Sequence, residues 1–211
     1  MDVLERFRQI GIIPVVAIDD AKDAKALGEA LVKGGLPCAE VTFRTAAAEE
    51  AIRIMSQEFP EMLVGAGTVL TTEQVDRAVA AGAKFIVAPG CNPKVVKYCL
   101  EKNIPMTPGV ATASEIEMAL EAGVKTVKFF PAEPNGGLPM IKALAAPYVD
   151  VTFMPTGGLT KDNVRDYLKY DRIVACGGTW MVNKSLISEG KFDEIERLTK
   201  EAADIVKEIR G

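Results

Sequence analysis

Short apolar runs rich in β-branched residues recur eight times along the chain, and segments with helical periodicity separate them. The runs span residues 12–18, 37–43, 62–67, 84–89, 104–108, 125–130, 151–156 and 172–178. Strands that alternate with helices are typical of βαβ units and of a parallel sheet. Eight units in 211 residues give about 26 residues each, which is the repeat that a closed barrel needs. The pattern therefore predicts an α/β chain folded as a (β/α)8 TIM barrel.

The segments between these runs have the apolar spacing of helices and end in glycine. The clearest of them span residues 21–35, 46–59, 71–83 and 114–123. We expect Gly34, Gly82 and Gly123 to end helices, and a last helix from about Phe192 to Arg210. A doubly wound open sheet is the alternative, but it seldom has eight equal units and the first unit lacks a G-x-G-x-x-G turn. No linker or composition break divides the chain, so we expect one domain over residues 1–211.

Composition excludes several classes of protein. Hydrophobic residues make up 48% and charged residues 26% of the chain, which is enough apolar surface to bury a core. The chain has 29 acidic and 25 basic side chains and no block of like charges, so we expect no nucleic-acid partner. No apolar run is long enough to span a membrane. The first twenty residues lack a signal-peptide cleavage site, so we expect an amphipathic turn there and a cytoplasmic protein.

The chain contains few types of side chain that could act as a catalytic base, nucleophile or metal ligand. The chain contains no histidine, and this removes the commonest general base and the commonest metal ligand. Its four cysteines are far apart and lie mostly in apolar runs, which favours reduced core residues over disulfides or a metal cluster. They are Cys38, Cys91, Cys99 and Cys176. We therefore expect no metal and no cofactor, with chemistry carried by Lys, Glu, Asp, Thr or backbone groups.

Polar residues alternate with apolar ones along the second expected strand. Glu40, Thr42 and Arg44 share one face of the strand, and Val41 and Phe43 take the other. In a barrel the face toward the helices must be apolar, so the three polar side chains should point to the axis and rise toward the C-terminal mouth. The alternative is a structural ion pair between Glu40 and Arg44, or a shifted register. Burying charge without a function is costly, and this favours a polar site.

The sixth expected strand repeats this alternation. Thr126 and Lys128 share one face, and Val127 and Phe129 take the other. Burial disfavours the charged form of an amine, so an inward Lys128 is a candidate nucleophile of the Schiff-base type. The alternative is a structural lysine paired with Glu40. Lys125 begins the strand on the opposite face and is expected to face solvent.

Glycine-rich turns follow the last two expected strands, at residues 155–163 and 176–180. In barrels a phosphate group commonly binds between these two loops, where glycines let backbone N–H groups approach it and a helix N-terminus adds positive potential. Ordinary tight turns also use paired glycines, so each turn alone is a weak signal. A third glycine turn at residues 65–69 offers the Thr68 hydroxyl at the mouth, or simply a helix cap.

Seven motifs together resemble those of a known family. They are EVTFRT, VGAGTVL, APG, TPGV, KFFPAE, PTGG and GGTW, in this order over nearly the whole chain. The sequence resembles the bacterial 2-keto-3-deoxy-6-phosphogluconate (KDPG) aldolases, a family that also includes 4-hydroxy-2-oxoglutarate aldolase activity. The resemblance implies a (β/α)8 barrel, a homotrimer, and class I cleavage to pyruvate and glyceraldehyde 3-phosphate without a metal.

The resemblance also implies roles for particular residues. The Schiff-base lysine of the KFFPAE motif falls on Lys128, and the acid/base glutamate of EVT falls on Glu40. Arg44 and Thr68 would hold the carboxylate of the pyruvyl group. Thr156 would contact the substrate hydroxyl.

The remaining positions form the wall of the pocket and the phosphate site. Pro89 and Phe130 would line the pocket. The phosphate would be held by Gly157, Gly158, Gly178 and Thr179. Thr179 stands where the family usually has serine, which keeps the hydroxyl and adds a methyl group.

Three other functions remain open at this point. Within the class, the substrate could be the phosphogalactonate epimer or unphosphorylated 4-hydroxy-2-oxoglutarate. Outside it, a catalytically silent barrel could serve as a trimeric assembly or binding module. The presence of both Lys128 and Glu40 favours an enzyme.

Overall fold

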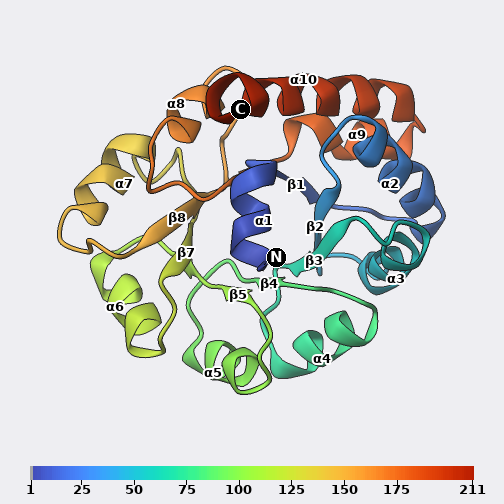
Figure 1. Ribbon diagram of the computed structural model, residues 1–211. Coiled ribbons are helices and arrows are strands. Elements are labelled where there is room, and N and C mark those ends of the chain that lie inside the picture. Colours follow the sequence, from blue (N-terminus) through green and yellow to red (C-terminus); the bar gives the residue numbers. More distant parts are fainter. Residues whose placement is uncertain (1) are drawn as a thin grey trace.

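The computed structural model describes residues 2–211 as a (β/α)8 barrel with parallel strands inside and helices around them (Figure 1). The strands are β1 (Ile12–Val16), β2 (Cys38–Thr42), β3 (Leu63–Gly67), β4 (Ile86–Val87), β5 (Met106–Thr107), β6 (Gly109–Val110), β7 (Thr126–Phe129), β8 (Thr152–Pro155) and β9 (Cys176–Gly178). Each lies within one of the eight expected runs, except that β6 extends the fifth run beyond its end. The predicted fold is confirmed.

Pairing of the strands accounts for the closed ring. Hydrogen-bonded neighbours run in the orders β5-β4-β3-β2-β1-β9 and β6-β7-β8, and every pair is parallel. β5 and β6 are two parts of one barrel strand, separated by Pro108, which has no N–H to donate to a ladder. Bridges from Phe153 to Ile173 and from Thr156 to Gly177 join the β8 side to the β9 side.

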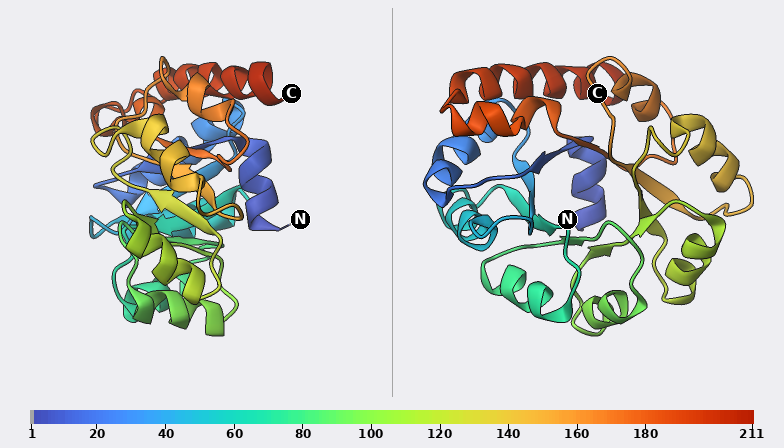
Figure 2. Two further views of the ribbon diagram at one scale, coloured as in Figure 1. Left: turned by 90° about the vertical axis from the view of Figure 1, so that its left-hand side faces the viewer. Right: turned by 180° about the vertical axis from the view of Figure 1, so that it is seen from behind.

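A ring of helices covers the outside of the barrel (Figure 2). They are α2 (Ala24–Lys33), α3 (Ala48–Glu58), α4 (Thr72–Ala80), α5 (Pro93–Glu101), α6 (Ala113–Glu121), α7 (Gly137–Ala145), α8 (Val164–Leu168), α9 (Lys184–Ser188) and α10 (Phe192–Arg210). Two 3-10 turns, Ala21–Asp23 and Trp180–Val182, precede α2 and α9. The last helix has the predicted bounds.

Glycines end three of these helices, as predicted. Gly82 and Gly123, with φ of +108° and +91°, have the left-handed backbone that favours glycine. Gly34 is the C-cap of α2 with φ of −70°, and the left-handed residue after it is Gly35 at +89°. Gly34 must also be small, because a Cβ there would lie 2.5 Å from the Cβ of Thr199 on α10.

The segment before β1 is a full helix where an amphipathic turn was expected. This helix, α1 (Val3–Ile10), covers the N-terminal end of the barrel (Figure 1). Phe7 packs edge to face on Phe85 with ring centroids 4.9 Å apart. The Arg210 guanidinium donates to the carbonyls of Ile173 and Val174 and anchors the end of α10 there. The barrel is therefore closed at this end and its polar interior opens at the other.

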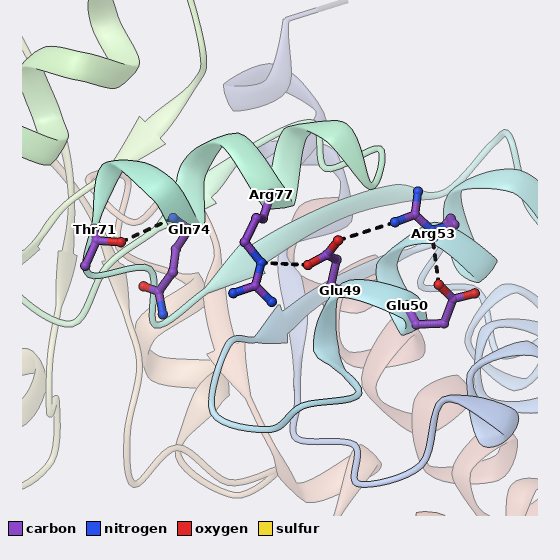
Figure 3. A network of polar contacts seen from close by, with 6 residues as sticks. All are labelled: Glu49, Glu50, Arg53, Thr71, Gln74 and Arg77. Atoms are coloured by element: carbon purple, nitrogen blue, oxygen red, sulfur yellow. Dashed lines mark hydrogen bonds and ion pairs between the residues drawn. The ribbon is translucent and has the colours of Figure 1, made fainter.

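An ion-pair network joins α3 to α4 on the outside of the barrel (Figure 3). The Glu49 carboxylate lies 3.4 Å from Arg53 on its own helix and 2.7 Å from Arg77 on α4. The Arg77 guanidinium also lies 5.8 Å from the centroid of the Phe43 ring. Exposed ion pairs add little free energy of unfolding. Their effect here is local: they link α3 to α4, and they place Arg77 beside Phe43, the residue before Arg44.

All four cysteines are free, as predicted, and three of them are buried. Burial raises the pKa of Cys99 to about 11 and that of Cys176 to about 12, which makes both thiols unreactive. Within residues 2–211, no helix is both long and apolar enough to cross a membrane.

Candidate active site

A small cavity of about 150 Å³ opens at the C-terminal ends of the strands. It is lined by Val15, Glu40, Thr42, Arg44, Thr68, Pro89, Lys128, Phe130, Thr156, Gly157, Gly158, Leu159, Gly177 and Thr179. Every residue that the sequence predicted for the site is in this set except Gly178. Larger hollows occur elsewhere on the surface, but this one alone among the described pockets contains a buried lysine and a buried glutamate.

Lys128 and Glu40 meet at the floor of the cavity. Lys128 on β7 is 4% exposed and Glu40 on β2 is 0% exposed. The Nζ of Lys128 lies 3.2 Å from Oε1 of Glu40 and 5.2 Å from the centroid of the Phe130 ring. Within residues 2–211, Glu40 forms its ion pair with Lys128 and not with Arg44. The pair is compatible with both the structural and the catalytic interpretation of Lys128.

Glycine on the neighbouring strand makes room for the glutamate. A Cβ at Gly67 of β3 would lie 2.2 Å from Oε1 of Glu40, so any side chain there would displace the carboxylate. The predicted alternation along β7 is also found: Lys128 points inward, whereas Lys125 on the opposite face is exposed and lies 3.3 Å from Asp150. Strand register and a missing side chain together aim Glu40 at Lys128.

Two buried oxygens in the cavity have no hydrogen-bond partner within residues 2–211. They are Oε2 of Glu40 and Oγ1 of Thr156. Leaving a buried polar atom unpaired costs about 1–3 kcal/mol, and such atoms in native proteins call for an explanation. Glycine at position 177 leaves room for the Thr156 hydroxyl, because a Cβ there would lie 2.3 Å from its Oγ1. Both oxygens are available to a bound ligand or water.

Arg44 and Thr68 lie higher, at the mouth. Arg44 follows β2, is exposed, and forms no ion pair with any carboxylate of residues 2–211. Thr68 follows β3 with φ of +55°, an unusual backbone conformation for a threonine and one that clusters at functional sites. By contrast, the Thr42 hydroxyl donates to the Val16 carbonyl at 2.8 Å and so serves the packing of β2 on β1.

The two glycine turns differ in what they present to the cavity. Gly157 and Gly158 both line it, with φ of +100° and +82° that only glycine adopts readily. Gly178 does not line it, because successive residues of β9 face opposite ways and a Cβ at Gly178 would lie 2.2 Å from the Trp180 ring. Gly177 lines the cavity instead. Of this glycine pair, Gly177 faces the cavity and Gly178 lies behind it, so a contact of Gly178 with a phosphate stays a prediction.

Four residues of the lining were not assigned to the site from the sequence: Val15, Thr42, Leu159 and Gly177. Two signals could have found part of this set. Thr42 shares the inward face of β2 with Glu40, and Leu159 directly follows the glycine pair. Val15 is an ordinary apolar strand residue, and nothing in its type marks it.

Metal ions need sets of donor side chains that lie close together. Within residues 2–211, no cluster of three or more histidine, cysteine, aspartate or glutamate side chains could hold a metal ion. The polar groups of the cavity are a lysine, a glutamate, an arginine and threonine hydroxyls. Chemically, this arrangement offers a nucleophilic amine, a proton carrier beside it, and donors for anionic groups.

Comparisons with known proteins agree with this chemistry. The family model "KDPG and KHG aldolase" matches residues 3–198. A Haemophilus influenzae protein named 2-dehydro-3-deoxy-phosphogluconate aldolase is 52% identical over 97% of both chains. An Escherichia coli protein named KHG/KDPG aldolase is 40% identical over 93% of this chain and 92% of its own.

A solved structure gives the same result at the level of the fold. It is a KDPG aldolase from Legionella pneumophila with pyruvate captured at low pH as a covalent carbinolamine intermediate. It superposes with a TM-score of 0.91 at 38% identity, and the match covers 95% of this chain and 97% of the other. The chain belongs to the KDPG and KHG aldolase family.

Proposed function

We propose that the protein is a class I aldolase that cleaves KDPG to pyruvate and glyceraldehyde 3-phosphate. The observation that carries this proposal is the buried contact of 3.2 Å between Lys128 and Glu40, beside a carboxylate oxygen that has no partner within residues 2–211. The Haemophilus influenzae relative bears the name of this activity at 52% identity. The family resemblance of the sequence implies the same reaction.

Lys128 is the nucleophile of the proposed reaction. Oε1 of Glu40, 3.2 Å from its Nζ, can accept a proton from the ammonium group and so free the amine. The amine attacks the ketone carbon of the substrate to give a carbinolamine, and a proton from Glu40 lets water leave. The product is an iminium ion linked to Lys128, which withdraws electrons from the neighbouring carbon–carbon bond.

Glu40 then moves the protons that cleavage requires. Its free Oε2, or a water bound there, takes the proton of the C4 hydroxyl. The C3–C4 bond breaks, the aldehyde leaves, and the bonding electrons pass into the iminium to form an enamine. Glu40 returns a proton to C3, and water hydrolyses the resulting imine to release pyruvate and restore Lys128.

The residues around this pair orient the substrate. Arg44 and Thr68 are proposed to hold the carboxylate, since a guanidinium and a hydroxyl at the mouth both donate to anions. Thr156, whose Oγ1 has no partner within residues 2–211, is proposed to bind the substrate hydroxyl. Pro89 and Phe130 form apolar walls.

The phosphate is proposed to lie between the turns after β8 and β9, at Gly157, Gly158, Gly178 and Thr179. Backbone N–H groups and the Thr179 hydroxyl are the donors there. Neither turn contains an arginine, and Lys161, in the turn before α8, lies 3.5 Å from Glu201 on α10. The site is therefore one of directed hydrogen bonds and not a charge clamp.

A second candidate is the unphosphorylated substrate 4-hydroxy-2-oxoglutarate. The name of the Escherichia coli relative, KHG/KDPG aldolase, favours it. Cleavage rates on KDPG, its C4 epimer and 4-hydroxy-2-oxoglutarate, measured as pyruvate release, separate these activities. We expect the highest kcat/KM on KDPG. A higher value on another of the three would reassign the substrate, and no release from any would overturn the aldolase proposal.

We further propose one domain over residues 1–211, a homotrimer, and a cytoplasmic enzyme of the Entner–Doudoroff route. The family resemblance implies the trimer, and four free cysteines are typical of a reducing compartment. Light scattering after size-exclusion chromatography tests the trimer, and a monomer mass would refute it. Cell fractionation tests the compartment.

A further inference from the structure

The turn after β8 is tied to two neighbouring segments through its carbonyl groups. Ala132 N donates to Thr156 O at 2.8 Å, and Glu133 N donates to Gly157 O at 3.0 Å. Asn163 Nδ2 donates to Gly158 O at 3.1 Å. The first two donors belong to the loop between β7 and α7, and the third lies just before α8, next to it in the ring (Figure 1).

These contacts orient the N–H groups of the turn. In a planar trans peptide, the carbonyl of one residue and the N–H of the next point in opposite directions. The bond to Gly157 O therefore turns the N–H of Gly158 away from the β7–α7 loop, and the bond to Gly158 O turns the N–H of Leu159 away from Asn163. Within residues 2–211 neither N–H has an acceptor, and both residues line the active cavity.

One side-chain pair supports this arrangement from outside the cavity. The hydroxyl of Tyr167 on α8 donates to Oε1 of Glu133. Tyr167 is 2% exposed, and both side chains line a separate cleft between α7 and α8 instead of the active cavity. The backbone N–H of Glu133 thus binds the carbonyl of Gly157, while its carboxylate points away from that turn toward Tyr167.

The side chains of Glu133 and Tyr167 leave no room for a Cβ at two nearby positions, both of which are glycine. A Cβ at Gly158 would lie 2.6 Å from the Cβ of Glu133, so Glu133 packs directly on the turn. A Cβ at Gly137 would lie 2.8 Å from the Tyr167 hydroxyl and 2.9 Å from Oε1 of Glu133. The contact between α8 and the β7–α7 loop is therefore close-packed, and a shift of Glu133 would be transmitted to Gly157 and Gly158.

We propose that Glu133 and Tyr167 are positioning residues for substrates that carry a phosphate. Glu133 holds the glycine turn so that the N–H groups of the turn face the cavity. Tyr167 holds the Glu133 carboxylate, and this keeps the negative charge of Glu133 away from the bound anion. Neither residue contacts the proposed position of the reacting carbons. This inference rests on the proposed function, because it assigns these residues to the phosphate site of the proposed aldolase.

The test compares KDPG with the same 2-keto acid lacking its phosphate. Tyr167→Phe and Glu133→Ala remove the side-chain hydrogen bond, whereas Glu133→Gln keeps an acceptor for the tyrosine. Losing one such bond should raise KM for KDPG roughly threefold to tenfold. The unphosphorylated acid should be cleaved with unchanged kcat/KM, and Glu133→Gln should stay close to the wild type on both substrates.

Tyr148→Phe is the matched control. The hydroxyl of Tyr148 also donates to a glutamate, Glu117, at 2.8 Å, and this exposed pair lies outside the cavity lining. This variant should change neither kinetic constant on either substrate. Inorganic phosphate gives a second readout, because Trp180 is the one tryptophan of the chain and follows Thr179. Phosphate should change Trp180 fluorescence with an affinity that Tyr167→Phe and Glu133→Ala weaken.

The outcomes separate this inference from the proposed function. Equal losses on the two acids, or unchanged KM for KDPG in both Tyr167→Phe and Glu133→Ala, would overturn the positioning role. A wild type that cleaves both acids equally well would overturn the phosphate placement, and the positioning role with it. A wild type that cleaves neither would overturn the aldolase proposal itself. If Tyr167→Phe does not fold, Glu133→Ala at an exposed position decides between the first two outcomes.

Discussion

Glu40 has one property of a structural counter-ion and one that a counter-ion does not need. One of its oxygens pairs with Lys128, and the other is buried without a partner within residues 2–211. A structural ion pair normally satisfies its remaining lone pairs, because unpaired buried oxygens are costly. The free oxygen therefore supports the proposal that Glu40 carries protons in the reaction.

Replacing Glu40 by glutamine tests this role at the level of one atom. Glu40→Gln keeps the shape and the hydrogen bonding of the side chain but cannot carry a proton. We expect kcat to fall about 10² to 10⁴-fold, and the protein to stay folded because a neutral amide is easier to bury than a carboxylate. Steady-state kinetics and thermal unfolding measure both. Turnover within a few-fold of the wild type would make Glu40 only a counter-ion.

Thr179 carries the second residue-scale prediction. It lines the cavity beside the turn after β9, where its hydroxyl is the one side-chain donor proposed for the phosphate. Thr179→Val keeps the shape and removes a charge-assisted hydrogen bond, a loss of roughly 1.5–3 kcal/mol, or about 10 to 150-fold in kcat/KM on KDPG. Because remote binding can assist the chemical step, part of the loss is expected in kcat.

The control for Thr179→Val is the same variant on unphosphorylated 4-hydroxy-2-oxoglutarate, whose cleavage should hardly change. Equal losses on the two substrates would place the phosphate elsewhere. They would also shift the preferred function toward the unphosphorylated acid.

Single elements show where sequence patterns succeed and where they stop. The alternation along β2 and β7 was enough to predict that Glu40 and Lys128 point inward, because strand geometry has a fixed period of two. Arg44 follows the end of β2 and lies exposed at the mouth instead. Period alone could not choose between Gly177 and Gly178, since neither has a side chain whose polarity marks a face.

The helix α1 is the element whose type was predicted wrongly, as an amphipathic turn. Its eight residues are too few to form a stable helix alone, so its structure depends on packing against the barrel end. That contact is between Phe7 and Phe85, which lie far apart in the sequence. A pattern within α1 gives no information on this partner.

A variant of Phe7 tests the contribution of α1 to the fold. Phe7 is 1% exposed, so Phe7→Ala should lower the free energy of unfolding by about 3–5 kcal/mol. Denaturant unfolding measures this loss, with Phe7→Leu as a milder control. The cavity lies at the opposite end of the barrel, so kcat below the unfolding transition should be retained. A loss under ~1 kcal/mol would show that α1 is not a structural part of the barrel.

At the scale of the whole molecule, the site exists only because the barrel closes. Glu40 and Lys128 are 88 residues apart in the sequence and meet across the barrel interior. The parity of each strand predicts that both point inward, and it offers their pairing only as one alternative. The pairing itself depends on how the closed barrel places β2 and β7, whose side chains meet at 3.2 Å.

Covalent trapping tests the central claim most directly. Pyruvate and borohydride are added to the native enzyme, and the modified peptide is located by mass spectrometry. An imine formed by the buried amine is reduced to a stable product, so we predict one three-carbon adduct per chain, on the peptide that contains Lys128. An adduct on the exposed Lys125 or on Lys142, or no adduct at all, would contradict the account.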